Sequence, residues 1–486
     1  MIVRVTCDRA GHTGTAKRPA IRSELLARAL ARLVLDRTQV RQLWFVIGIL
    51  GGCVPSRTAT FGPVDHEVQR RTGLAVEWSE GDRTTAAIDA LLARELDVDA
   101  AVRIAFARNR RLQARLDELG IAASQVASAT VLPPATVDAD YKRALSGSGS
   151  EMELTVVQDV LDLVQLGQRR GIADAELAAA QARAVAATIE LAGEVEVAYD
   201  EVVAAEQGRG LAETAFATAS ASADLVERQH AAGNATDLAL AREQEQRERA
   251  RIDVGRADQA RTERRARFAA MVGITGKPAW TTATRLPDPP AMLPALDDLL
   301  RAAATASLDA IALRADADAA RARHRYALVR AFLPQLGLGA AVARRTGETW
   351  EAGPAIRIGI PLFDQQQGPR ARAIAEERRA RDELAATESE LAATVQTTRS
   401  RVEQAFAEVR QLVDVVMPLR KRVLDETVLH YNAMNASTFE LLAARREAVE
   451  VERQYIAALR AYWTAIAEAK TLRRGGRAML DKERSP

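Results

Sequence analysis

Two acids and two histidines stand at matching places in two long helix-forming stretches of the sequence. His230 and His430 come just before a predicted turn, and Asp237 and Glu440 come just after one. The helix dipole alone favours an acid in the first turn of a helix, and a histidine at a helix end is usually solvated, although imidazoles do bind transition metals. We therefore treat the two histidines as weak metal candidates and predict no metal site.

The sequence lacks motifs for other kinds of chemistry. It has no phosphate-binding loop, no zinc motif and no nucleophile paired with a base, so we expect no enzyme activity and no cofactor. Lys and Arg total 67 and Asp and Glu total 65, and the two signs are interspersed along the helical stretches, as on solvated helix faces. No dense basic patch with interleaved aromatic residues is present, and we expect no nucleic-acid partner.

The sequence around Cys53 has the pattern of a lipidation signal. The apolar run 43–52 is too short to cross a bilayer as a permanent helix, but it has the length of the hydrophobic part of a signal peptide. It ends in Leu-Gly-Gly-Cys, which resembles the bacterial lipobox, in which the cysteine is lipidated and becomes the mature N-terminus. We predict that residues 1–52 are removed and that Cys53 carries lipid. A short buried segment with an ordinary cysteine is the alternative.

The segments on either side of Cys53 need separate explanations. Fifty-two residues are many for such a signal, and a start codon assigned too far upstream would explain the excess. Residue 54 is valine rather than aspartate, which in such lipoproteins fits sorting to the outer membrane. Residues 53–97 mix glycine, proline and threonine with short helical pieces, and we expect them to form an extended segment around a larger body.

The acids and histidines lie at the tips of predicted long helical hairpins. Residues 161–233 contain no proline, are rich in helix formers and repeat apolar side chains at steps of three and four. About 70 helical residues make a rod of roughly 100 Å. Gly233 can take the left-handed conformation that ends a helix, and helix-forming sequence resumes over 236–271. The prediction is a very long antiparallel helical hairpin.

The same plan returns about two hundred residues later. Pro133 reappears as Pro334, and Ala235 reappears as Ala436, both at an offset of 201. A constant offset between landmarks in one order argues for an internal duplication. The second long helix contains Pro418, which should kink it because proline removes a helical hydrogen bond.

Each half also carries a predicted short helix and two predicted strands. The strands alternate apolar and polar residues around glycine-containing turns, which predicts β-hairpins. Two strands alone are not stable in water or in lipid, so the hairpins must join other strands. The short helices are 98–131 and 296–332, the strand pairs are 135–141 with 151–158 and 335–345 with 351–360, and the second long hairpin is 370–432 with 437–472.

These elements divide the chain into six predicted segments. They are a removed segment 1–52, a lipidated extension 53–97, a first repeat 98–276, a linker 277–294, a second repeat 295–475 and a tail 476–486.

This order of elements resembles the outer-membrane efflux protein family, the TolC-like channels, over roughly 98–472. The resemblance rests on the duplicated order of short helix, Leu-Pro, strand pair and long hairpin, and on the two tips, 232–238 and 431–442. It implies a mainly α chain that forms a homotrimer, in which the long helices build a trimeric α-barrel across the periplasm. Each chain would give four strands to a 12-stranded outer-membrane β-barrel, whose closure removes unpaired strand edges.

The resemblance also implies a function. The trimer would be the passive exit duct of a tripartite efflux system, in which an inner-membrane transporter and a periplasmic adaptor deliver drugs or heavy-metal ions. The lipobox points to the lipoprotein subgroup. Aromatic residues make up only 4% of the chain, and Tyr141, Trp350 and Phe363 are the candidate anchors at the membrane interface. A periplasmic coiled-coil adaptor or scaffold lipoprotein is the alternative, although an adaptor would carry one hairpin flanked by compact β domains.

Members of this family close their periplasmic end with residues at the hairpin tips. Acids at the positions of Asp237 and Glu440 take part in the closed gate or line the constriction, and Tyr431 matches a tyrosine that helps to hold the gate. The resemblance therefore implies a gate role for these three residues. The chain departs from the family pattern at Ala436, where the archetype has a gate arginine, and at Ala443, which replaces a second ring acid. These departures weaken the case for the same hydrogen-bonded lock.

We expect Cys53→Ala to abolish metabolic labelling of the protein by palmitate, because the lipidated thiol is lost. Labelling and N-terminal processing can be followed together in cells that express either form. Cys7→Ala, which replaces the other cysteine, is the control and should leave labelling intact. Unchanged labelling and processing of the Cys53 variant would refute the predicted lipid anchor.

Overall fold

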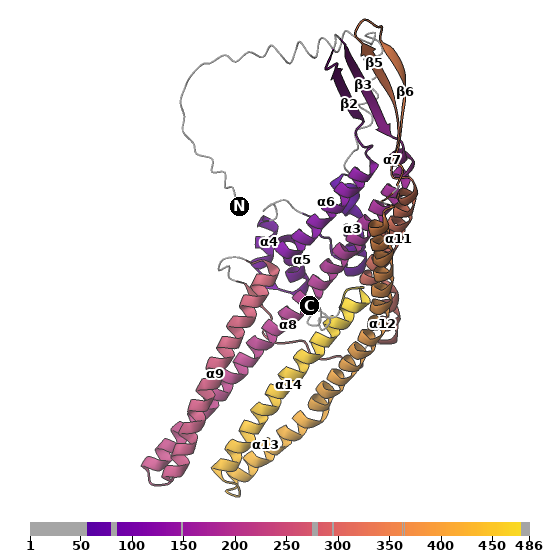
Figure 1. Ribbon diagram of the computed structural model, residues 1–486. Coiled ribbons are helices and arrows are strands. Elements are labelled where there is room, and N and C mark those ends of the chain that lie inside the picture. The colour runs from indigo at the N-terminus through magenta and orange to yellow at the C-terminus, as the bar shows by residue number, and fades with distance from the viewer. Residues whose placement is uncertain are drawn as a thin grey trace, which may run out of the picture. The chain divides into compact units, whose positions relative to one another are not determined.

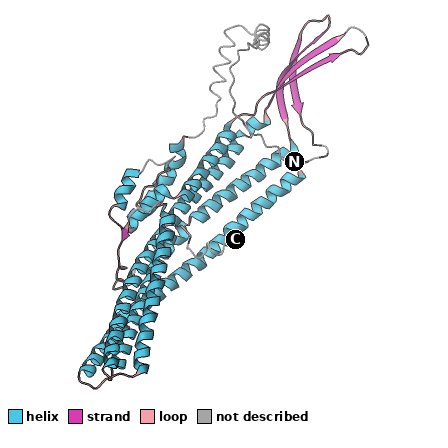
Figure 2. Cartoon of the chain, turned by 90° about the vertical axis from the view of Figure 1, so that its left-hand side faces the viewer, coloured by secondary structure: helices cyan, strands magenta, loops and turns pink. Residues whose placement is uncertain are grey.

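The computed structural model describes residues 56–78, 85–146, 149–274, 280–293, 296–361, 363 and 365–477. The chain divides into Met1–Cys53 and Val54–Pro486, and the description below concerns the second unit. Cys53 and the predicted signal segment lie outside the described residues. The second unit is mainly helical, with one four-stranded sheet at one end and the tips of two long helical hairpins at the other (Figures 1 and 2). Within the described segments, no helix combines the length and apolarity needed to cross a membrane.

The first repeat follows the predicted order of elements. It contains α5 (Val98–Arg108), α6 (Arg110–Thr130), β2 (Thr136–Arg143), β3 (Ser150–Asp159), α7 (Leu161–Val164), α8 (Leu166–Ala231) and α9 (Asp237–Val272). The prediction of one unbroken helix over 98–131 is wrong at Asn109. This residue ends α5, and its side chain caps α6 by accepting a hydrogen bond from the backbone N–H of Leu112 at 2.9 Å. Gly233 has a φ of 75°, which confirms the left-handed residue at the first tip.

The second repeat has the same order, with one irregular turn. It contains α10 (Leu296–Ala306), α11 (Leu308–Phe332), β5 (Leu336–Arg345), β6 (Glu351–Ile358), α12 (Gln367–Gln411), the π-helical turn η1 (Leu412–Val416), α13 (Met417–Asn432) and α14 (Thr438–Arg473). The prediction of one unbroken helix over 296–332 is wrong at Ser307, whose side chain caps the second of two helices. The disruption predicted at Pro418 takes the form of η1, which ends two residues before the proline. Proline cannot donate to the carbonyl of Asp414, and a wider turn accommodates the lost bond.

The two strand hairpins join into one sheet. β2 pairs with β3, β3 with β5 and β5 with β6, all antiparallel, which gives the order β2-β3-β5-β6. Each hairpin therefore gains two more strands from the other repeat. The expectation that neither pair stands alone is confirmed.

The segment before the first repeat is more ordered than the sequence predicted. An extended segment was expected, but α3 (Arg57–Thr72) is a regular helix with Ser56 as its N-cap and Gly73, at φ 77°, after its end. Val64 and Val68 are fully buried, because their spacing of four places both on one face against α6 and α8. Short elements follow in α4 (Thr85–Leu92) and β1 (Glu95–Leu96), which pairs in parallel with β4 (Thr281–Thr282).

One arginine of α3 holds the ends of two helices in the second repeat. The guanidinium of Arg71 donates from Nη1 to the carbonyl oxygens of Ala306 and Arg474, at 2.7 and 2.6 Å. These carbonyls lie at the C-terminal ends of α10 and α14, where backbone acceptors lack helical donors. The interaction explains how the N-terminal segment is fixed to the repeat that lies farther along the chain.

An aromatic cluster lies in the main core, where the two repeats and the linker meet. Phe268 of α9 lies between Tyr199 of α8 and Trp280 of the linker, with ring centroids 6.2 and 5.3 Å apart. The hydroxyl of Tyr199 donates to the carbonyl of Leu96 at 2.8 Å, which satisfies its buried oxygen. The guanidinium of Arg265 lies 3.7 Å from the centre of the Trp280 ring. The predicted linker is therefore packed against the helices at Trp280, and it is buried again at Leu286.

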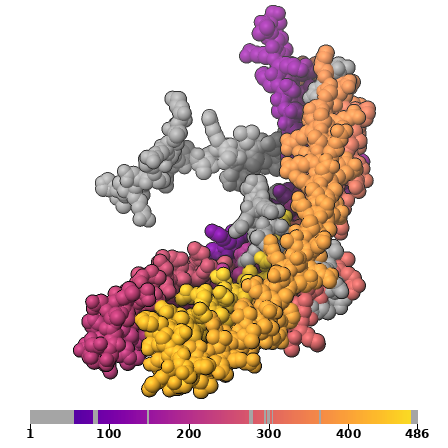
Figure 3. All heavy atoms as spheres, turned by 90° about the horizontal axis from the view of Figure 1, so that it is seen from below, coloured from indigo at the N-terminus to yellow at the C-terminus, as the bar shows by residue number. Residues whose placement is uncertain are grey.

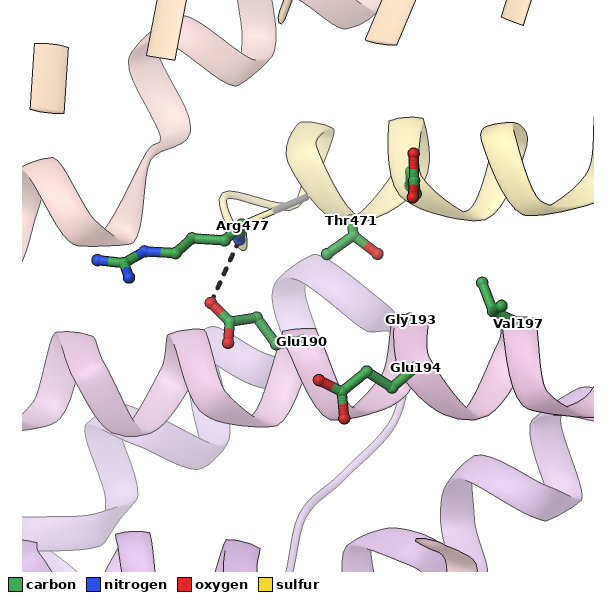
Figure 4. Close-up of a pocket in the computed structure, with 7 residues that line it drawn as sticks. Glu190, Gly193, Glu194, Val197, Thr471 and Arg477 are labelled. Atoms are coloured by element: carbon green, nitrogen blue, oxygen red, sulfur yellow. Dashed lines mark hydrogen bonds between the residues drawn. The ribbon is translucent and has the colours of Figure 1, made fainter. Parts of the chain in front are cut away.

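Helices α8 and α14 approach each other closely at Gly193. A Cβ atom at this position would lie 2.1 Å from Oγ1 of Thr471, well inside contact distance. Figure 4 shows Gly193 on α8 facing Thr471 on α14, beside Glu190, whose carboxylate accepts from the backbone N–H of Arg477 at 3.3 Å. Only glycine fits at this crossing unless the threonine moves.

We expect Gly193→Ala to destabilise the protein by about 1–3 kcal/mol, because the added methyl group overpacks the helix crossing. Thermal unfolding of the purified protein measures the effect. Thr471→Ala removes the opposing atoms and should restore more than half of the loss in the double variant. Gly208→Ala on the same helix is the matched control, because its Cβ would meet nothing within 4 Å. Equal losses at Gly193 and Gly208 would refute the close crossing.

Candidate functional site

One face of the sheet is apolar and exposed. Residues opposite each other in an antiparallel ladder point to the same side, so the register assigns every strand residue to a face. Val137 lies opposite Val156, Tyr141 opposite Met152, and Leu338 opposite Ile356. Seven of the large apolar side chains on this face are 41% to 68% exposed: Val137, Tyr141, Met152, Val156, Leu338, Ile356 and Ile358. An exposed apolar face of this extent indicates contact with lipid or with another protein.

The opposite face of the sheet is polar. It carries Asp138, Asp140, Lys142, Glu151, Glu153, Thr155, Arg345 and Arg357. The guanidinium of Arg357, on edge strand β6, donates to Asp138 on the opposite edge strand β2 at 2.5 Å. Three strand spacings on a flat sheet would be about 14 Å, which exceeds the reach of an arginine side chain. The sheet therefore curls toward its polar face.

A glycine permits close approach within the sheet. A Cβ atom on Gly339 of β5 would lie 1.8 Å from the carbonyl oxygen of Val156 on β3. No side chain fits there without displacement of the backbone. Gly337 and Gly339 both lie on the polar face between β3 and β6, so no side chain of theirs obstructs Arg357 as it crosses the sheet.

Both edges of the sheet are unpaired within the described chain. β2 and β6 each have one neighbouring strand. Such edges carry free backbone donors and acceptors that pair readily with another strand. The three aromatic residues singled out in the sequence lie at the two ends of this sheet. Tyr141 and Trp350 are near the β-turn end and Phe363 follows β6 at the helix end, with exposed fractions of 68%, 45% and 95%.

The first hairpin tip joins two of the predicted site residues. The Nε2 atom of His230, near the end of α8, lies 2.7 Å from Oδ1 of Asp237, the first residue of α9. The pair closes the turn around Gly233, while Thr236 caps α9 by accepting from the backbone N–H of Ala239. The structure therefore gives His230 and Asp237 a common role within one tip. Their spacing of seven residues around a glycine is the signal in the sequence that could have predicted this pairing.

The second tip uses its acid differently. Ser437 and Glu440 form a capping box: the Glu440 carboxylate accepts from the Ser437 backbone N–H at 2.6 Å, and Ser437 Oγ accepts from the Glu440 backbone N–H at 3.2 Å. The bond from the backbone of Ser437, followed by that from its hydroxyl, holds the pKa of Glu440 below its usual value. The Ser-x-x-Glu motif is visible in the sequence and is typical of such a cap, whereas we predicted only a gate role or a dipole effect for Glu440.

The other residues of the second tip make fewer contacts. Tyr431 is partly buried and His430 is exposed, and neither side chain has a hydrogen-bond partner among the described residues. Met434 has a φ of 60° and is 94% exposed, in the place that Gly233 occupies in the first tip.

The two tips lie beside each other, magenta and yellow in the view from below (Figure 3). No group of three or more His, Cys, Asp or Glu side chains in the described part of the chain is placed to hold a metal ion.

Known structures with a similar fold include outer-membrane proteins and channels. The outer membrane protein VceC of Vibrio cholerae matches with a TM-score of 0.62 at 17% identity, over 78% of this chain and 96% of that one. A membrane protein from Pseudomonas aeruginosa matches with 0.60 at 20% identity, over 78% and 93%. The Campylobacter jejuni CmeC outer membrane channel matches with 0.59 at 14% identity, over 85% and 92%. No model of a known protein family and no curated protein sequence matches the chain.

We expect Glu440→Ala to speed amide hydrogen exchange several-fold over residues 437–441 at pH 7, because the start of α14 loses its capping box. Glu440→Gln should exchange like the parent, since the glutamine oxygen accepts the same bond. A carboxyl with a lowered pKa stabilises the fold above that pKa and ceases to do so as the pH falls through it. At acid pH, after correction for intrinsic rates, the parent should therefore approach the alanine variant. Equal protection in all three proteins at pH 7 would contradict the capping role.

Proposed function

We propose that this chain, which has the fold of outer-membrane channels, is the outer-membrane exit duct of a tripartite efflux system. Three copies would assemble with their sheets closed into a 12-stranded barrel and their long helices forming a tunnel across the periplasm. An inner-membrane transporter and a periplasmic adaptor would deliver the exported compound, a drug or a heavy-metal ion. A lipid on Cys53 would add a second attachment to the outer membrane.

The two-faced sheet is the observation that carries this proposal. Membrane barrels alternate lipid-facing apolar residues with lumen-facing polar residues along each strand, and the register of β2, β3, β5 and β6 separates the two kinds in this way. The strands contain 8 to 10 residues, close to the length that a tilted strand needs to cross a bilayer. Pairing of β6 in one copy with β2 in the next would satisfy both free edges. The curl toward the polar face has the sense that closure around an aqueous lumen needs.

The space between the two long hairpins supports an adaptor partner. An open groove of about 470 Å³ lies between α8, α9 and α14. Small residues such as Ala204, Gly208 and Ala257 line it, together with arginines that include Arg453. Small side chains let another helix come close. The groove also contains acids that pair with its arginines, such as Asp253 with Arg453 at 3.5 Å, so it offers charges of both signs to that helix. These features fit docking of a helical hairpin from a periplasmic adaptor.

The tips are the proposed periplasmic gate. Asp237, Tyr431 and Glu440 would stand around the threefold axis at the entrance, where like charges in a narrow opening attract cations. Their local bonds set limits on this role. Asp237 is bonded to His230 and Glu440 to Ser437, so each acid would contribute a fixed charge, and neither is free to form a new lock without breaking an existing bond.

The alternative, a periplasmic adaptor or scaffold lipoprotein, fits the structure less well. The described chain has two long hairpins joined through one sheet, and its other β structure is the two-residue pair of β1 and β4. In the Cys53→Ala variant, which would lack the lipid anchor, an adaptor should dissociate from membranes at high salt. A barrel should remain with the outer membrane until detergent is added.

We expect the purified protein to form heat-modifiable trimers and to conduct ions in planar bilayers, since barrel closure leaves an aqueous lumen. In the same recordings, Glu440→Gln should lower cation selectivity while it preserves the capping box, because only the charge is removed. Glu243→Gln is the comparison, since that buried acid lies on α9 and accepts from Ser222. A monomeric protein that does not conduct would refute the channel proposal. Unchanged selectivity in Glu440→Gln would refute the gate role of Glu440.

A further inference from the structure

Arginines gather on the helix ends next to the sheet. α6 and α11 end there, and α8 and α12 begin there (Figure 1). The eight residues of each helix nearest the sheet, a little over two turns, contain no Asp or Glu. They contain six arginines, which we call the arginine belt: Arg169, Arg170, Arg325, Arg330, Arg370 and Arg372. The first acids on α8 and α12 come later, at Asp174 and Glu376.

An apolar collar lies between the arginine belt and the sheet. It consists of Leu163, Val164, Phe332, Ile360 and Phe363, which are 51% to 95% exposed. Three of the segments that connect strands to helices supply these side chains: α7, the end of α11 and the loop after β6. Along the chain axis, the order is thus apolar sheet face, apolar collar, arginine belt and mixed-charge helix. A lipid leaflet presents the complementary order of acyl chains, phosphates and water.

The arginines of the belt differ in whether they form ion pairs within the chain. Arg330 pairs with Asp162, and Arg372 pairs with Glu376 at 2.7 Å. Arg325 and Arg370 are exposed and have no ion-pair or hydrogen-bond partner among the described residues. An unpartnered guanidinium presents several donors in a plane that matches phosphate oxygens. These two arginines are the ones most available to an external anion.

We propose that the arginine belt binds the phosphate groups of phospholipids in the periplasmic leaflet of the outer membrane, with a preference for anionic lipid. Arg325 and Arg370 make the principal contacts, and the apolar collar enters the acyl region of the same leaflet. The inference rests on the proposed function, because it places the sheet in the membrane. It adds the lipid class that this end of the channel recognises and the residues that recognise it.

The test measures thermal stability of the purified full chain in detergent with added lipid. Phosphatidylglycerol should raise the unfolding midpoint more than phosphatidylcholine at the same mole fraction, and the difference should shrink as salt rises. The double variant Arg325→Gln/Arg370→Gln should lose most of that difference while keeping the increment from phosphatidylcholine. Arg422→Gln/Arg446→Gln removes the same charge from exposed, unpartnered arginines of α13 and α14 and should behave like the parent.

Three results would overturn the proposal. They are an unchanged preference for phosphatidylglycerol in the belt variant, an equal loss in the control variant, and an equal rise in the midpoint with glycerol phosphate in place of lipid. The last would show that free phosphate is sufficient. Conductance of the belt variant in planar bilayers separates this inference from the function on which it rests. A conducting channel without lipid preference refutes the belt alone, whereas a parent protein that does not conduct refutes the channel.

Discussion

The antiparallel pairing of β3 with β5 is the contact on which the arrangement of the two repeats depends. A strand hairpin by itself leaves an edge of unpaired amides and carbonyls on each side. The ladder from Glu151 opposite Arg345 to Asp159 opposite Gly337 covers one edge of each hairpin with backbone from the other repeat. It also brings α8 and α12 to start at the same end of the sheet. The two long hairpins consequently run in the same direction.

Pairing of β3 with β5 leaves two parts of the sheet unsatisfied within a single chain: its outer edges and its apolar face. The outer edges of β2 and β6 have no partner in the described chain, and the apolar face has no cover over most of its large side chains. Backbone groups in lipid must be paired internally, so a sheet of this kind enters a bilayer only as part of a closed barrel. The trimer and the membrane location are thus two parts of one proposal. The trimer would pair the strand edges, and the lipid would cover the apolar face.

The features that the sequence predicted well depend on neighbours along the chain. The apolar stripe of α8, the turn at Gly233 and the alternation of Met152, Leu154 and Val156 can be seen without any distant contact. The break at Asn109 was missed because its flanks favour helix, and only its side-chain cap separates α5 from α6. The order of the four strands was out of reach, since it follows from pairing between residues nearly two hundred positions apart. At the tips, the residues were found but their bonding partners were not.

The two tips differ, and the difference has a consequence for symmetry. In the proposed trimer, six helical hairpins would surround the entrance, and a strict duplication would make them equivalent around a sixfold axis. The first tip has an imidazole beside its acid and a glycine at its turn, whereas the second has an uncompensated carboxylate at a helix cap and an exposed methionine in the same backbone conformation. Charge and apolar surface would therefore alternate around the ring with a period of two hairpins. Partner molecules that bind these tips would therefore find equivalent binding positions every 120° around the ring, and not every 60°.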